Sequence, residues 1–135
     1  MDKILKAVSG ILGGVAGFLW GDLDGLLLAL FGFMTIDFVT GLIVGGIDHR
    51  LDSEICFRGL AKKMLIVAFV AVAHLLDTQI LQGEASMCRS AVICFYAANE
   101  GISILENAGK LGMPLPKKLK DILAQLKDEE DHKDE

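Results

Sequence analysis

The 135-residue sequence is poor in the features that mark soluble enzymes and nucleic-acid-binding proteins. It contains two prolines, one tryptophan and one tyrosine. A basic patch with interleaved aromatic residues is absent, which argues against a nucleic-acid partner. The sequence also lacks a nucleophile elbow, a phosphate-binding loop and the spacing of zinc ligands. We therefore expect a protein that is not an enzyme and that has no cofactor and no metal site.

The three cysteines, Cys56, Cys88 and Cys94, have no paired spacing. Cys88 and Cys94 lie in or beside an apolar stretch, where cysteine behaves as a small hydrophobic residue. We interpret them as packing residues rather than as metal or redox ligands. The formal net charge of −5 says little about partners, because much of it comes from the final eight residues, DEEDHKDE.

Apolar residues, by contrast, dominate the chain: 53% of residues are hydrophobic and the mean hydropathy is +0.50. Charges gather in short patches, and the apolar runs between them approach the roughly 20 helical residues that cross a bilayer. The runs cover 4–20, 26–47, 64–81 and 88–107. The predicted fold class is all-α: a polytopic membrane protein of about four transmembrane helices, or three if the first is interfacial. Residues 1–113 would form this domain.

Residues 114–135 are predicted to leave the bilayer as a cytoplasmic amphipathic helix with a charged tail. An apolar stripe at helical spacing, followed by a tail expected to lack regular structure, supports this reading. The stripe consists of Leu115, Leu119, Ile122 and Leu126. The distribution of Lys and Arg then predicts that both termini and the connection 48–63 lie in the cytoplasm.

Four ionisable residues lie inside the apolar runs: Asp37, His74, Asp77 and Glu100. An ionised acid costs about 2.5–3.5 kcal/mol at the centre of a span, so these groups must be paired, neutral or hydrated. Asp77 and Arg89 flank a short connection and are predicted to pair. His74, one helical turn before Asp77, is a further pairing candidate or a packing residue.

A second set of polar residues is predicted to line a pore or a subunit interface. One face of the last apolar helix is polar, because its polar residues recur at steps of three and four. That face carries Asn99, Ser103, Glu106, Asn107 and Lys110. The candidates for the pore or interface are Asp37, Thr40, Asn99, Glu100, Ser103 and Asn107. Glycines at small-xxx-small spacing are predicted to support helix contacts. They are Gly10, Gly13, Gly14, Gly17, Gly41 and Gly45.

Five stretches together resemble the phage holin family that includes the toxin-secretion and phage-lysis holins. They are 37–42 (DFVTGL), 57–63 (FRGLAKK), 73–77 (AHLLD), 96–107 (YAANEGISILEN) and 112–116 (GMPLP). The resemblance implies homo-oligomers in the bacterial cytoplasmic membrane that open it abruptly. A peptidoglycan hydrolase, or in some relatives a large toxin, then escapes, without necessarily touching the oligomer. Family members have no catalytic residues.

Two other classes of function stay open from the sequence. Carboxylates deep in apolar helices are a feature of proton-coupled transporters and small ion channels. Four short helices without an internal repeat make a poor alternating-access transporter unless the protein dimerises. The second class is a membrane adaptor without a pore, which would recruit a partner through the helix at 115–126.

Overall fold

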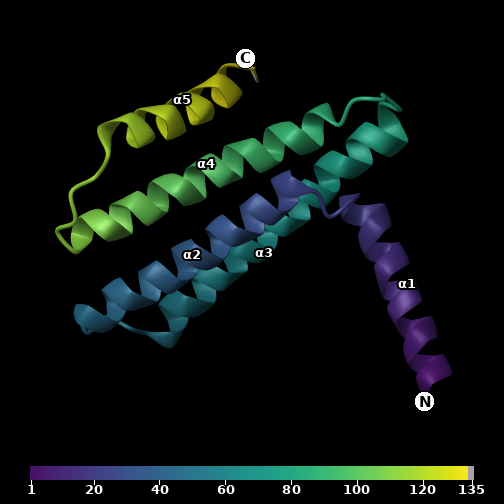
Figure 1. Cartoon of the computed structure of the whole chain (residues 1–135), viewed down its shortest axis with the longest axis horizontal. Coiled ribbons are helices and arrows are strands. Elements are labelled where there is room, and N and C mark those ends of the chain that lie inside the picture. The colour runs from purple at the N-terminus through teal and green to yellow at the C-terminus, as the bar shows by residue number, and fades with distance from the viewer. Residues whose placement is uncertain (134–135) are drawn as a thin grey trace.

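The computed structural model describes residues 1–133, and every regular element in that part of the chain is helical (Figure 1). In order, the elements are α1 (Asp2–Trp20), α2 (Gly25–Ile47), α3 (Ser53–Leu75), a short π-helix η1 (Leu76–Ile80), α4 (Met87–Lys110) and α5 (Lys117–Lys133). The all-α class predicted from the sequence is confirmed for these residues.

Helix α4 is the centre of the fold, because it packs against α2, α3 and α5 (Figure 1). The hydrophobic core joins α2, α3 and α4, and its most completely buried side chains are Leu30, Val70 and Ile93, one from each of these helices. Core positions in α2 recur at helical spacing, as Leu27, Leu30 and Met34 do. The apolar faces of α2 and α3 therefore meet the one helix that carries most of the polar groups.

Helix α1 projects away from this bundle: the C-terminal end of α1 lies next to the bundle, and none of the residues of α1 is buried (Figure 1). The Trp20 indole N–H donates to the Val67 carbonyl at 2.8 Å, which ties that end to α3. Gly21 follows with φ +74°, and a Cβ added there would lie 2.8 Å from His74 Cε1. Only glycine satisfies both the backbone conformation and the close approach.

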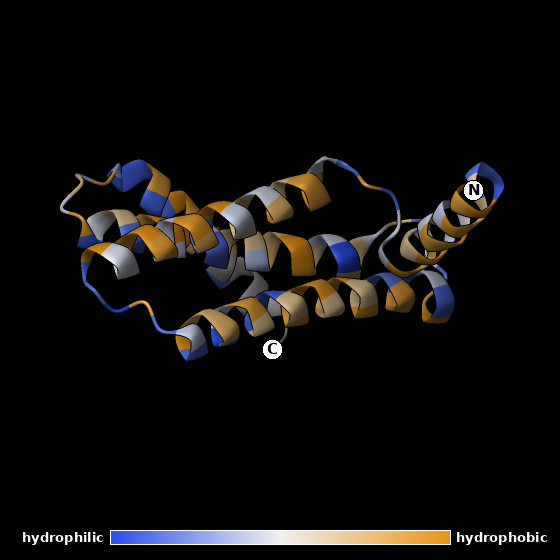
Figure 2. Cartoon of the chain, turned by 90° about the horizontal axis from the view of Figure 1, so that it is seen from below, coloured by the Kyte–Doolittle hydropathy of each residue, from blue (hydrophilic) through white to orange (hydrophobic). Residues whose placement is uncertain are grey.

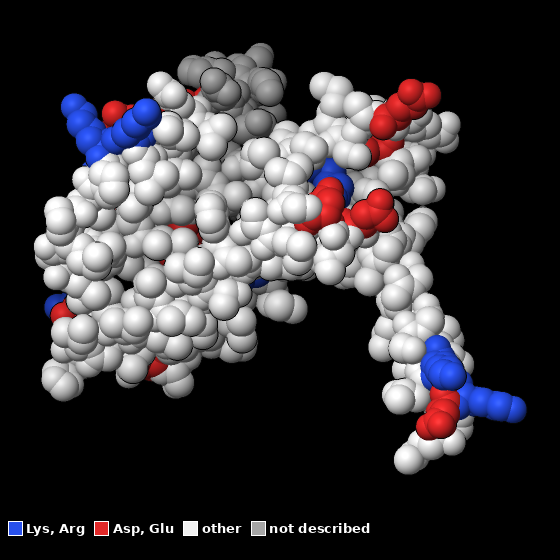
Figure 3. Space-filling view, in the orientation of Figure 1, with Lys and Arg blue, Asp and Glu red and all other residues white. Residues whose placement is uncertain are grey.

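Three helical segments are long and apolar enough to cross a membrane: α1, α2, and α3 together with η1 (Ser53–Ile80). Many large apolar side chains on these segments are exposed, and the connections at the bundle ends are hydrophilic (Figure 2). The face of the bundle in Figure 3 is largely uncharged. Helix α4 does not belong to this set of three, so the predicted count of four spans stays a prediction.

Two helix boundaries differ from those expected. Helix α3 begins at Ser53 rather than near residue 64, because the Asp52 carboxylate caps it by accepting the Glu54 N–H at 3.0 Å. Helix α5 extends to Lys133, past Leu126, where a tail without regular structure was expected. The last two residues of that predicted tail, 134 and 135, lie outside the described part of the chain.

Candidate functional site

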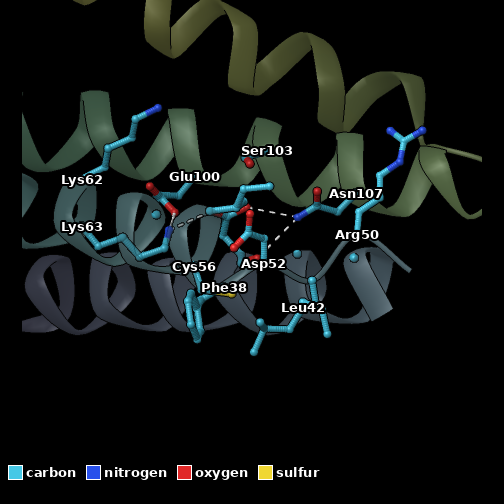
Figure 4. Close-up of a pocket in the computed structure, with 16 residues that line it drawn as sticks. Phe38, Leu42, Arg50, Asp52, Cys56, Lys62, Lys63, Glu100, Ser103 and Asn107 are labelled. Carbon is cyan, nitrogen blue, oxygen red and sulfur yellow. Dashed lines mark hydrogen bonds and ion pairs between the residues drawn. The ribbon is translucent and has the colours of Figure 1, made fainter. Parts of the chain in front are cut away.

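An ion cluster joins the three helices of the bundle at Lys63, Asp37 and Glu100. The Lys63 Nζ lies 2.8 Å from Asp37 Oδ2 and 2.6 Å from Glu100 Oε2. The three side chains are only 10–16% exposed, and Figure 4 shows Lys63 and Glu100 pointing toward each other. Two carboxylates thus share one ammonium group, which leaves one negative charge uncompensated within this cluster.

Asn107 extends the cluster along α4 toward Thr40 of α2. Its Nδ2 donates to Asp37 Oδ1 at 3.2 Å and to Thr40 Oγ1 at 2.9 Å (Figure 4). The Thr40 hydroxyl in turn donates to the Asp37 carbonyl at 3.0 Å. Buried polar groups are stable only with such partners. The network therefore explains how Asp37 and Glu100 can lie between apolar helices.

A cavity of about 400 Å³ adjoins this network. Its polar lining includes Ser103, Lys62 and Arg50 in addition to the network residues, and Phe38 and Leu42 form part of its apolar wall. Within residues 1–133, no cluster of His, Cys, Asp and Glu has the composition of a metal site. The arrangement can hold charges and water between helices, but it has no nucleophile paired with a base.

Of the six predicted pore or interface residues, four belong to one network: Asp37, Thr40, Glu100 and Asn107. Ser103 lines the adjoining cavity, whereas Asn99 is half-buried and does not. The polar residues of α4 that line the cavity are Glu100, Ser103 and Asn107, of which Ser103 is half-buried, and Glu106 is exposed. The polar face is therefore turned by about one residue from the one predicted, which began at Asn99.

Lys63 was not among the predicted site residues, because the sequence pattern placed it in a connection between helices. A signal was present: Ile66 and Val70 follow Lys63 by three and seven residues and are both buried. Residues at this spacing share a helical face. Once Asp52 is recognised as the cap of α3, Lys63 falls on the inward face of that helix.

A second cluster, around Arg89, lies at the opposite end of the bundle. The Arg89 guanidinium lies 2.8 Å from Asp24 Oδ2 and donates to the carbonyls of Trp20 and Asp22, both at 2.9 Å. The predicted side-chain pair between Asp77 and Arg89 is not formed. Instead, the Asp77 carboxylate accepts the backbone N–H groups of Cys88 and Arg89, at 3.0 and 2.8 Å. Asp77 therefore caps α4 from η1.

His74, the third pairing candidate, does not bond to either group. Its Nδ1 is buried without a hydrogen-bond partner among the described residues, and its ring packs against Gly21. In this structure His74 therefore lies at a packing position against Gly21, and its part in pairing stays a prediction.

The six glycines predicted to support helix contacts divide into two groups. A Cβ at Gly41 would lie 3.9 Å from Asn107 Nδ2, and one at Gly45 would lie 3.1 Å from Leu51 Cδ2. For four glycines of α1, nothing lies within 4 Å of an added Cβ. These four are Gly10, Gly13, Gly14 and Gly17. Their contacts stay a prediction that a single chain does not test.

Replacing Asp77 by alanine is expected to destabilise the start of α4. The first N–H groups of a helix have no intrahelical acceptor, and a carboxylate at this end also interacts favourably with the helix dipole. Losing both hydrogen bonds should cost about 1–3 kcal/mol. Hydrogen exchange at the amides of Cys88 and Arg89 should accelerate about tenfold or more, with little change at Lys110. Equal exchange in both proteins would contradict the capping role.

The Arg89 cluster also predicts a dependence of stability on pH. The hydrogen bond from Arg89 lowers the pKa of Asp24 from its usual 3.8, and the Leu27 N–H lowers it further. A carboxyl group with a lowered pKa in the folded state stabilises the protein above its ordinary pKa. That contribution is lost as the pH falls through the lowered value.

To test this dependence, the unfolding midpoints of the parent protein and of Asp24→Asn are measured in detergent micelles as a function of pH. The unfolding midpoint of the parent should exceed that of the variant by a constant amount near neutral pH, and this difference should shrink below about pH 4. A gap that stays the same throughout the acidic range would show that the Asp24 charge contributes nothing.

These helices and this buried polar network define an all-helical protein with three segments long and apolar enough to span a membrane. A profile of the bacteriophage holin family matches residues 14–128. The chain belongs to this bacteriophage holin family. It is 34% identical over 118 residues to a probable holin of Bacillus phage phi105, covering 87% of this chain and 85% of that one.

Other relatives cover nearly the whole chain. An uncharacterized protein of Listeria innocua is 42% identical over 140 residues, covering 99% of this chain and 97% of the relative. One from Halalkalibacterium halodurans is 38% identical over 134 residues, covering 96% and 98%. No solved structure matches the chain.

Proposed function

We propose that this protein is a holin that assembles from many copies in the bacterial cytoplasmic membrane, with both termini in the cytoplasm. The assembled copies open a lesion through which a cell-wall hydrolase, or a large toxin, passes. Membership of the holin family and the likeness to a probable phage holin support the proposal.

The observation that carries it is the shared Lys63 ammonium between Asp37 and Glu100. Within one chain this cluster is almost fully satisfied, so a single copy can accumulate without conducting. Its one uncompensated negative charge favours water or a neighbouring polar group over lipid. Assembly exchanges the internal pairs for a hydrated interface, which is a shift between two states rather than a chemical step.

The test is induced expression together with a hydrolase that lacks its own export signal. A holin should leave the membrane potential intact for a lag and then abolish it abruptly, and the hydrolase should be released at the same moment. Glu100→Gln should change the length of the lag, because it removes the uncompensated charge. Unchanged lysis timing would show that this charge has no part in opening.

The same two carboxylates also favour a second candidate, an ion channel or proton-coupled transporter. Such a protein should leave cells viable, respond to a substrate or proton gradient, and release no hydrolase. An adaptor acting through α5 should lose function when α5 is removed and should conduct nothing. The expression test separates all three.

A further inference from the structure

The cavity beside the ion cluster opens at the surface of the bundle, between α2 and α3. Three apolar side chains that line it are themselves exposed: Leu42 to 36%, Leu51 to 56% and Ile55 to 62%. A residue that lines a cavity and is also exposed stands at its rim. The cavity is therefore open to a ligand from the surroundings, rather than being a sealed void in the core.

The floor of α3 leaves room in this cavity at Gly59. Gly59 is one of the lining residues, and nothing lies within 4 Å of a Cβ added there. Glycine in a helix interior destabilises the helix relative to alanine, so this room has a cost in stability. A larger side chain at position 59 would fill the cavity without forcing the helices apart.

Two basic side chains that line the cavity, Arg50 and Lys62, have no ionic partner. Both are exposed, and neither pairs with any acid among the side chains that the structure describes. Figure 4 shows Arg50 and Lys62 extending on one side of the polar network, and Phe38 and Leu42 on the opposite side. The cavity thus has a cationic side and an apolar side, which is the polarity of an amphiphilic anion rather than of a small ion.

The acidic side chains of the cavity are already engaged and do not neutralise these two cations. Asp37 and Glu100 both pair with Lys63, at 2.8 and 2.6 Å. The Asp52 carboxylate accepts the first hydrogen bond of α3 as its cap. The one negative charge left uncompensated in the ion cluster is buried with it, whereas the two cations stand at the surface. Their counter-charge must therefore come from outside the chain.

The position of the cavity along the bundle matches the boundary between lipid headgroups and hydrocarbon. Arg50 lies in the connection between α2 and α3, where two candidate spans end. The span Ser53–Ile80 has 28 residues, about eight more than the hydrocarbon requires. In a bilayer its first turns would stand among the headgroups, and the Lys62 side chain would extend to that level. Leu42, five residues before the end of α2, would lie beside the acyl chains.

We propose that this cavity binds an anionic phospholipid. The headgroup phosphate lies between Arg50 and Lys62, and an acyl chain follows the apolar side at Phe38. Basic pockets between membrane helices bind anionic headgroups in this way, and a guanidinium group offers a phosphate two parallel hydrogen bonds. Lipid binding does not depend on the proposed lesion, because a single chain in a membrane suffices for it.

Quenching of tryptophan fluorescence by brominated lipids measures this binding. The sequence has one tryptophan, so Trp20→Phe with Phe38→Trp places the sole tryptophan in the cavity. In bilayers of phosphatidylcholine and phosphatidylglycerol, the binding constant at this position should favour phosphatidylglycerol about tenfold. The control carries its tryptophan at position 36 of α2, where Ile36 is 48% exposed and lies outside the cavity. There the two brominated lipids should quench equally.

A matched pair of variants separates the cavity from general attraction between basic residues and anionic lipid. Arg50→Gln with Lys62→Gln should abolish the preference at position 38. Lys117→Gln with Lys118→Gln removes the same charge from exposed positions of α5 that do not line the cavity. This second variant should keep the preference.

A second matched pair tests the space rather than the charge. Gly59→Leu should abolish quenching by phosphatidylglycerol above the level of phosphatidylcholine, because the new side chain fills the cavity. Gly32→Leu is the control, since nothing lies within 4 Å of a Cβ added there either and Gly32 is outside the cavity. It should leave the preference unchanged.

The unmodified chain provides a measurement that does not depend on the tryptophan variants. In nonionic detergent micelles, the unfolding midpoint followed by Trp20 fluorescence should rise with added phosphatidylglycerol and not with phosphatidylcholine. Glycerol phosphate, the headgroup without acyl chains, should not raise it at the same concentration, because the apolar side is part of the site. Equal effects of the two lipids or of glycerol phosphate, or a preference that survives Arg50→Gln with Lys62→Gln, would overturn the inference. So would a preference that survives Gly59→Leu.

Discussion

Replacing Lys63 by methionine is expected to lower the free energy of unfolding by about 3–5 kcal/mol. The ammonium is the shared partner of Asp37 and Glu100, at 2.8 and 2.6 Å. Without it, two carboxylates that are only 16% and 10% exposed face each other between apolar helices. The measurement is denaturant unfolding in detergent micelles, followed by the fluorescence of Trp20.

The chain supplies its own control for this experiment. Lys62 precedes Lys63 and is exposed, and Figure 4 shows its side chain directed away from the Lys63–Glu100 pair. Lys62→Met should change stability by less than about 0.5 kcal/mol. Adding Glu100→Gln to Lys63→Met should restore part of the loss, since it removes one uncompensated charge. Equal stability of Lys62→Met and Lys63→Met would refute the role given to the cluster.

In cells, Lys63→Met is expected to shorten the lag before lysis. The closed chain loses its internal pairing, while the hydrated assembly does not depend on that pairing, so the equilibrium shifts toward assembly. The onset of depolarisation, measured at matched expression levels, provides the comparison. A lengthened lag in a protein that still inserts would show that the pairing supports the open form instead.

Replacing Arg89 by alanine is expected to have the next largest effect on stability, about 2–3 kcal/mol, because Asp24 is partly exposed while two backbone carbonyls lose a charged donor. Its side chain is 4% exposed, and its donors satisfy Asp24 and the carbonyls of Trp20 and Asp22. The loss should free the α1–α2 turn from α4. Protease cleavage between residues 20 and 25 should accelerate strongly, with other sites little affected.

Arg89→Lys should recover less than half of that stability. An ammonium group lacks the planar fork that reaches a carboxylate and two carbonyls together. The matched control is Arg58→Ala, since Arg58 pairs with Glu54 at 3.3 Å with both side chains more than 70% exposed. Such a surface pair should contribute no more than about 0.5 kcal/mol. Full rescue by lysine would mean that Arg89 acts as a simple charge.

The sequence predicted the helical class and singled out Asp37, Thr40, Glu100 and Asn107, because both depend on local patterns. Their assignment to a pore or subunit interface stays a prediction. Asp37 and Glu100 stand out as acids in apolar helices, and helical spacing places Asn107 and Glu100 on one face. Lys63 was missed because a charge near other charges suggests a loop, and the inward face of α3 is defined only once its start at Ser53 is known.

Other parts of the structure depend on contacts between distant segments. Arg89 pairs with Asp24 rather than with Asp77, because the α1–α2 turn packs beside the start of α4. Nothing in the local sequence shows which of these two acids would pair with Arg89. Similarly, the stripe of α5 predicts an apolar face, but the burial of Leu123 in particular depends on the space above Gly101.

Whether the Asp37–Glu100 network becomes hydrated when copies assemble can be measured by its water access. Ser103→Cys lines the cavity beside it, and Leu65→Cys, at 57% exposure, is an outward-facing control close to Lys63 in α3. The reaction rate of each cysteine with a charged thiol reagent is followed in vesicles, in a protein without native cysteines, at rising protein-to-lipid ratios. We expect the reaction rate at position 103 to rise with assembly while the rate at position 65 stays low. A rate at position 103 that never changes with assembly would contradict this expectation.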